Sequence, residues 1–279
     1  MKNYKVSKFF ESAFLHIFLM TIAVACLFPL FWMVRTSLMT RSAVFLDKGF
    51  IPAEINWGNY MQAWIEGDFG VYFFNSILYT VSVVLGIIIV ASLAAYAFSR
   101  LDFPGKNFFF YMFVAAMMIP LPGAFVPLVA LMNKTGLANT RIGYILCMIN
   151  VGLSMSVLLL KTFFDKMPKD LEDAARIDGC GRLGIWWYVA LPLARPAIAV
   201  IVIYNSLNVW NEYILANFLF SDSNLMPLQR GIMMFQGVHS VNYPLLMAGL
   251  TIAAFPIICV YLFMQKHIVK GLTSGAIVG

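Results

Sequence analysis

KMPKDLEDAARIDGCGRLGIWWYVALPLARP, from Lys166 to Pro196, is the stretch around which the chain is organised. It concentrates charged residues within a sequence that is otherwise strongly apolar. Pro168 stands where a first helical residue would, and acidic residues follow in the first turn, where a helix favours negative charge: Asp170, Glu172 and Asp173. Gly179 and Gly181 then predict a break, because glycine accepts the backbone angles of a sharp turn. The stretch therefore predicts two short helices joined by a kink, between long apolar segments.

The composition indicates a polytopic membrane protein. Of the 279 residues, 61% are hydrophobic and only 11% are charged, against roughly 25% charged residues in ordinary soluble domains. The basic residues separate apolar runs and do not form a stripe along one face, which favours a topology signal over a nucleic-acid partner. We therefore expect an all-α protein in contact with lipid and no nucleic-acid binding.

Six apolar runs of about 20 residues are long enough to cross roughly 30 Å of hydrocarbon. They are Ala13 to Val34, Val71 to Ser99, Asn107 to Met132, Ile142 to Leu160, Leu193 to Phe218 and Tyr243 to Gln265. The third contains the cluster Pro120, Leu121, Pro122, Gly123, which predicts a broken helix, because proline removes a backbone donor. A broken helix suits a moving gate, although irregular packing alone explains one as well.

The distribution of Lys and Arg predicts the orientation. With the N-terminus inside, 13 of the 19 Lys and Arg residues lie on the inner side. Positive charge is enriched in the cytoplasmic loops of membrane proteins. We therefore expect both termini, and the segment 166–192, to be cytoplasmic.

A motif in this segment resembles a known family. Asp173, Ala174 and Ala175, then three residues, Gly179, nine residues, and Val189 to Pro192 are similar to the EAA loop (E-A-A, G, I-x-L-P) of membrane subunits of binding-protein-dependent ABC importers. Asp173 stands for Glu and Val189 for Ile. The aspartate keeps the charge and shortens its reach. We call residues 166–192 the EAA loop, within a single permease domain that spans residues 1–279.

Further stretches resemble the carbohydrate type of these permeases, in particular the smaller permease subunit of maltose transporters. They are AYAFSRLDFPGK (Ala95 to Lys106), NVWNEYILA (Asn208 to Ala216) and the tail KHIVKGLTSGAIVG (Lys266 to Gly279). In that type of permease the tail reaches into the ATPase dimer, so Gly271 to Gly279 is a candidate contact; the alternative is a frayed chain end. IPAEINWGNYMQAW, Ile51 to Trp64, is also of this type. This external stretch either touches a sugar or a docking protein, or is a folded cap held by its own Trp and Tyr packing.

The resemblance implies a type I ABC importer permease fold that works with other subunits. These are a second homologous permease subunit, two ATPase subunits and an extracytoplasmic solute-binding protein, in the cytoplasmic (inner) membrane. The chain lacks the G-x-x-x-x-G-K-[ST] phosphate loop, so ATP and Mg²⁺ are expected on the ATPase subunits, with no cofactor bound by this chain.

The resemblance also assigns docking on the ATPase to the short helix of the EAA loop. Its candidate coupling residues are Glu172, Asp173, Ala174, Ala175 and Gly179. Small alanines allow close approach, and the carboxylates suit a cationic partner. The alternative is an amphipathic helix that merely lies at the membrane interface.

Polar residues within apolar runs are candidates for the substrate path. Such side chains are costly at membrane depth and usually face the bundle or a water-filled path. The candidates are Tyr204, Asn205, Asn208, Asn211 and Glu212, which cover adjoining parts of one helix face, together with Asn150 and Ser154. Amides and aromatic rings suit a sugar, whose hydroxyls need hydrogen bonds. The alternative is hydrogen bonding between helices.

The function expected from these features is ATP-driven import of a sugar or oligosaccharide, with no covalent chemistry in this chain. Another solute such as a glycerol phosphate or phosphodiester is the alternative within the same class. An ion-coupled secondary transporter would need acids at membrane depth, and Glu212 is the one candidate. A membrane enzyme or a metal site would need convergent ligands, whereas the histidines and cysteines lie at separate places: His16, His239 and His267, and Cys26, Cys147, Cys180 and Cys259.

Overall fold

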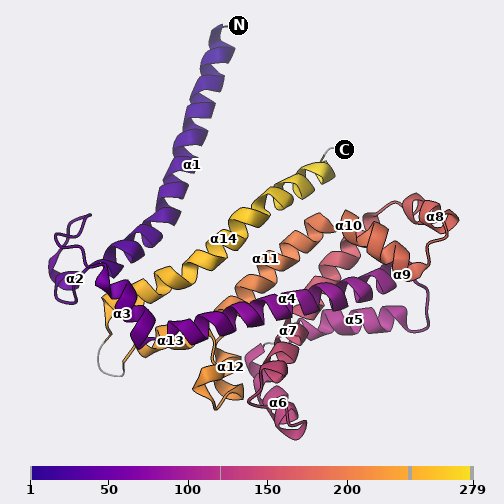
Figure 1. Ribbon diagram of the computed structural model, residues 1–279. Coiled ribbons are helices and arrows are strands. Elements are labelled where there is room, and N and C mark those ends of the chain that lie inside the picture. The colour runs from indigo at the N-terminus through magenta and orange to yellow at the C-terminus, as the bar shows by residue number, and fades with distance from the viewer. Residues whose placement is uncertain (1, 120, 238–240, 277–279) are drawn as a thin grey trace. The chain divides into compact units, whose positions relative to one another are not determined.

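The computed structural model describes residues 2–119, 121–237 and 241–276 (Figure 1). Regular structure in these residues is helical, apart from one isolated bridge between Gln236 and Val241. Four of the described helices contain a stretch long and apolar enough to cross a membrane. They are α1 (Lys2–Ser37), α4 (Phe69–Arg100), α7 (Arg141–Lys166) and α14 (Tyr243–Ala276). The all-α membrane fold is therefore confirmed.

The two other predicted spans are interrupted, so the described residues do not reproduce six continuous spans. The third is divided into α5 (Lys106–Ala116) and α6 (Leu121–Lys134), as its prolines predicted; Pro120 itself lies outside the described residues. In place of the fifth, α11 (Arg195–Asn211) is bent by 76° relative to residues 182–193. The predicted end at Phe218 is wrong, because α11 stops at Asn211 and a separate helix, α12 (Ile214–Leu219), follows.

The chain forms two compact units. The first comprises Met1–Phe69 and Gly231–Ala254, and the second Gly70–Arg230 and Phe255–Gly279. The short elements outside the EAA loop are α2 (Ala43–Leu46), α3 (Gly58–Glu66), the 3-10 turn η2 (Ser223–Leu225) and α13 (Leu228–Met234).

Arg35 organises the loop that follows α1 in the first unit. Arg35 is 3% exposed, and its guanidinium carbon lies 4.6 Å from the ring centroid of Trp32. It donates hydrogen bonds to the carbonyl oxygens of Gly49 (2.7 Å) and Asp47 (3.0 Å). The Asp47 carboxylate in turn accepts the N–H groups of Ala53 and Gly49, which lower its pKa. One buried cation thus holds the loop against the end of the helix.

Asn59 closes the same loop. Its buried side chain donates to the carbonyl oxygens of Ser37 (2.7 Å) and Met39 (2.8 Å). The Tyr60 hydroxyl lies 2.7 Å from Ser37 Oγ. The stretch Ile51 to Trp64 is therefore part of a cap held by its own contacts, while contact with a sugar or a docking protein stays a prediction.

The second unit is built around α7. Helices α5 and α11 pack against it, and α4 contacts it through aromatic side chains at two places. The Tyr79 and Tyr144 rings lie 4.7 Å apart near one end of this α4–α7 interface, and Tyr96 and Phe164 lie 5.9 Å apart near the other. Fully buried apolar side chains fill the core between these helices, among them Ile87, Leu160 and Ile201. This packing positions both the EAA loop and the polar face of α11.

Replacing Asn59 with alanine is expected to destabilise the cap. The substitution leaves the Ser37 and Met39 carbonyl groups without their donor, at a cost of about 1 to 3 kcal/mol. Thermal unfolding of the purified protein in detergent measures the loss. Gln62→Ala is the matched control, because Gln62 makes its hydrogen bond with Glu66 in solvent. Equal midpoints for the two variants would contradict this role of Asn59.

Candidate coupling loop and substrate path

The EAA loop contains the two short helices that the sequence predicts. They are α8 (Asp170–Ile177) and α9 (Arg182–Ile185). Gly179 ends the first with φ of +85°, and the Cys180 N–H donates to the Ala175 carbonyl at 2.9 Å. Only glycine adopts this backbone region without strain. The predicted kink between the two helices is therefore present at Gly179.

The predicted helix start at Pro168 is wrong. Helix α8 begins at Asp170. The Lys169 carbonyl oxygen accepts its first backbone hydrogen bonds, from the N–H groups of Glu172 and Asp173. Met167 is extended, with ψ of 132°, because a following proline disfavours the helical conformation. Pro168 therefore ends the preceding helix and lies in the connection.

An aromatic turn joins α9 to the membrane helix. Trp186–Ala190 forms a single π-helical turn, followed by α10 (Leu191–Leu193) and the bend into α11. Trp186 is buried, whereas Trp187 and Tyr188 are exposed. Helices with an inserted π turn are commonly found at functional sites.

One face of α8 is exposed. Asp173 and Arg176 form an ion pair of 2.8 Å within the helix, and their side chains are 59% and 57% exposed. Ala174 is exposed, and Ile177 is 87% exposed. The exposed face of α8 thus combines an ion pair, a small residue and one open apolar side chain. Ile177, one turn after Asp173, was not among the predicted coupling residues.

Glu172 faces the other way. It is 2% exposed, and its Oε1 lies 2.6 Å from Arg100 Nε, without the alignment of a hydrogen bond, so the attraction is that of an ion pair. The Tyr96 hydroxyl donates to Glu172 Oε2 at 3.4 Å. Arg100 also donates to the Met167 carbonyl oxygen at 2.6 Å. Of the predicted coupling residues, Glu172 and Ala175 are therefore turned inward, and Asp173 and Ala174 outward.

Arg100 was not among the predicted coupling residues. The available signal was its position as the last residue of an apolar helix, four residues after Tyr96, a spacing that places both on one helix face. Its buried partner is 72 residues away in the chain, and no local pattern pairs them.

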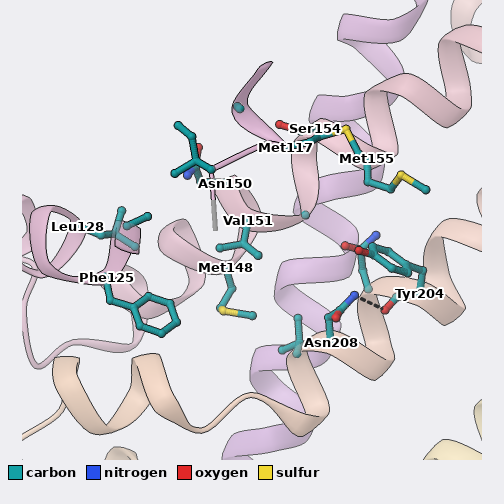
Figure 2. Close-up of a pocket in the computed structure, with 16 residues that line it drawn as sticks. Met117, Phe125, Leu128, Met148, Asn150, Val151, Ser154, Met155, Tyr204 and Asn208 are labelled. Carbon is teal, nitrogen blue, oxygen red and sulfur yellow. Dashed lines mark hydrogen bonds between the residues drawn. The ribbon is translucent and has the colours of Figure 1, made fainter. Parts of the chain in front are cut away.

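A cavity of about 300 Å³ lies between α6, α7 and α11 (Figure 2). Five of the predicted path residues line it: Asn150, Ser154, Tyr204, Asn205 and Asn208. Apolar side chains that the sequence analysis did not single out complete the wall, including Met117, Phe125, Met148 and Met155. Among the described lining residues none is charged. The wall is thus uncharged and largely apolar, with amide and hydroxyl groups at five positions.

Asn205 has a packing role. It is 1% exposed and donates to Ser156 Oγ on α7 (3.1 Å) and to the Ile201 carbonyl oxygen (2.9 Å). A side chain at Gly152 would collide with Asn205. Asn205 therefore makes the hydrogen bond between helices that the sequence analysis gave as the alternative to a substrate contact.

Tyr204 and Asn208 are the exposed members on the cavity side of α11. Tyr204 is 43% exposed, and the Asn208 side chain donates to the Tyr204 carbonyl oxygen at 2.9 Å (Figure 2). Asn211 makes the same local bond, to Leu207, but does not line this cavity. Of the polar residues predicted on α11, those up to Asn208 line the cavity and Asn211 does not.

Glu212 caps α12 and does not line this cavity. Its carboxylate accepts hydrogen bonds from the N–H groups of Leu215 and Ala216 at the start of that helix, where negative charge is favoured. The Tyr144 hydroxyl donates to the same carboxylate at 2.9 Å. These bonds compensate the charge of the Glu212 carboxylate.

Known proteins resemble the chain over most of its length. Residues 83–274 match the family model described as "Binding-protein-dependent transport system inner membrane component". The melibiose/raffinose/stachyose import permease protein MelC of Bacillus subtilis is 32% identical, over 92% of this chain and 94% of the relative. The trehalose/maltose transport system permease protein MalG of Thermococcus litoralis is 31% identical, over 92% and 93%.

A solved structure has the same fold. It is a crystal structure of a bacterial ABC transporter involved in the import of the acidic polysaccharide alginate. The matching chain is 25% identical, with a TM-score of 0.79, over 90% of this chain and 94% of that one. This similarity confirms the predicted importer permease fold.

Asn205→Ala is expected to lower stability more than Asn208→Ala. The first removes a buried bond between α7 and α11, worth about 0.6 to 1.7 kcal/mol in membrane helices, whereas the second removes an exposed local bond. Thermal unfolding in detergent compares the two variants. A midpoint for Asn205→Ala equal to that of the unsubstituted protein would contradict its packing role.

Proposed function

The chain belongs to the family of binding-protein-dependent transport system inner membrane components, and we propose that it is the permease subunit through which an ATP-driven importer moves a sugar or oligosaccharide into the cytoplasm. The observation that carries the proposal is the family match over residues 83–274, joined to the exposed Asp173 and Ala174 on α8. The family consists of transport components, so this subunit's task is translocation and not covalent chemistry.

The proposed assembly contains a second homologous permease subunit, two ATPase subunits and an extracytoplasmic solute-binding protein. ATP and Mg²⁺ act on the ATPase subunits, since the chain has no phosphate-loop motif. The EAA loop and both termini lie on the cytoplasmic side in this proposal, in agreement with the distribution of basic residues.

In this proposal the exposed face of α8 docks in a groove of an ATPase subunit. Asp173 meets a cationic group there, the small Ala174 permits close approach, and Gly179 allows the turn that presents the helix. Closure of the ATPase dimer on ATP pushes α8 and turns the membrane helices, so that the cavity opens outward. Hydrolysis resets the helices and releases the solute inside. This is alternating access between two states.

A sugar is the solute class that the cavity chemistry favours. Asn150, Ser154, Tyr204 and Asn208 offer hydrogen-bonding groups to hydroxyls, and the ring of Tyr204 offers an apolar face. A glycerol phosphate would bring a negative charge to a wall whose described residues carry no cation, and burying an unpaired charge is costly. An ion-coupled mechanism is disfavoured as well, because Glu212 is engaged as a helix cap.

Asp173→Lys is expected to uncouple transport from ATP hydrolysis. Losing one member of a desolvated charge pair at an interface costs about 2 to 5 kcal/mol, so uptake should fall at least about tenfold. The measurement is uptake and ATPase activity of the complete importer in proteoliposomes. Glu66→Lys is the control, since it makes the same charge change at an exposed position on α3. Normal uptake by the Asp173 variant would contradict the docking role of Asp173.

Asn208→Ala is expected to slow uptake of the sugar that the importer's binding protein carries. One lost hydrogen bond to a hydroxyl in the path is worth about 1 to 1.5 kcal/mol, or about tenfold in rate. Asn211→Ala is the matched control: Asn211 is another exposed amide with the same kind of backbone bond, outside the cavity lining. Equal uptake by the two variants would remove Asn208 from the substrate path.

A further inference from the structure

The inner ends of α4 and α7 meet α8 at one buried charge pair. We propose that the ion pair between Arg100 and Glu172 is a latch that transmits movement of α8 to α4, with both residues acting as positioning residues. This inference rests on the proposed function, because it concerns how docking on the ATPase moves the membrane helices. It adds a residue, Arg100, that lies outside the EAA loop.

Burial makes the pair a firm connection. The side chains of Arg100 and Glu172 are 5% and 3% exposed, and their closest atoms are 2.6 Å apart. Water cannot readily replace either partner, and separating them would leave two uncompensated charges in the interior. Moving α8 while the pair stays intact therefore moves the end of α4. By contrast, the Asp173–Arg176 pair is exposed and lies within α8, so it connects α8 to no other helix.

Arg100 joins three elements. It is the last residue of α4, it holds Glu172 of α8, and it donates to the carbonyl oxygen of Met167, which terminates α7. Tyr96, one turn earlier on α4, adds its hydroxyl to the other oxygen of Glu172. A displacement at Glu172 thus reaches the ends of two long membrane helices.

The chain itself gives α8 a looser connection on its other side. After α8, the backbone passes through Gly179 and Gly181, and a side chain placed at either position would meet nothing within 4 Å. Such an unpacked double-glycine link bends easily. Among the described residues of α8, the buried ones are Glu172 and Ala175. Helix α8 also contacts α9 and the π-helical turn Trp186–Ala190, and the ion pair is its direct connection to α4.

The route continues to the cavity. Ile87, in the middle of α4, lies where a side chain on Gly152 of α7 would be, so the two helices touch closely there. Gly152 is part of the cavity wall. Helix α8 thus has an outward face for the partner, with Asp173, and an inward face for the bundle, with Glu172.

The test measures ATPase activity of the complete importer in proteoliposomes, with and without its solute-loaded binding protein. In this proposal, a signal from the binding protein on the outer side reaches the ATPase subunits through α4 and α8. We expect Glu172→Gln and Arg100→Gln to lose about tenfold in the stimulation by the binding protein, taken relative to each variant's own basal ATPase activity, which is the scale of single-residue effects on coupling. The exchanged double variant R100E/E172R should recover most of the stimulation.

The control is Lys106→Gln, which removes an ion pair with the exposed Asp102 just after α4; its stimulation should equal that of the unsubstituted importer. Co-purification of the ATPase subunits reports assembly for each variant. Normal stimulation in assembled single variants would overturn the latch. So would single variants that fail to assemble, since the pair would then be purely structural, or an exchanged variant without recovery.

The latch and the proposed function fail differently. If the proposed function is wrong, the unsubstituted chain recruits no ATPase subunits, and no stimulation exists to be lost. If only the latch is wrong, the unsubstituted importer is stimulated normally, and the substitutions at Arg100 and Glu172 leave that stimulation intact.

Discussion

The buried ion pair between Arg100 and Glu172 sets the orientation of the EAA loop. Because a carboxylate removed from water requires a cation, Glu172 has to face the end of α4, and this requirement rotates α8 about its axis. Asp173 and Ala174 are then directed outward. One internal interaction thereby decides which side of a short helix is free for another protein.

Polar residues in the membrane helices serve two purposes here. Asn205 and Glu212 satisfy groups inside the chain, one by joining α11 to α7 and the other by capping α12. Tyr204 and Asn208 remain exposed on the wall of the cavity. Both arrangements follow from the cost of placing polar groups in lipid. A polar helix face is therefore a candidate for the substrate path only where its side chains are not already bonded to other helices.

The relatives import chemically diverse carbohydrates, from the raffinose series of MelC to the acidic polysaccharide of the solved transporter. The common fold therefore does not determine which solute is transported, and the residues of the cavity wall have to select it. In this chain the described wall is uncharged. The proposal of a neutral sugar thus depends on the site and not on the fold alone.

Local features of the sequence were sufficient to predict the helical class, the apolar runs, the break in the third run and the kink at Gly179. Each of these depends on the length of an apolar run or on the conformational preferences of glycine and proline, which act over a few residues. The motif around Asp173 was sufficient for the family. Tertiary structure alone decided that Glu172 turns inward to Arg100, that Asn205 binds Ser156, and that α11 ends at Asn211. These outcomes depend on contacts between side chains of helices that are far apart in the sequence. Neighbouring positions on one helix point about 100° apart, and only the tertiary structure decides which of them faces another helix.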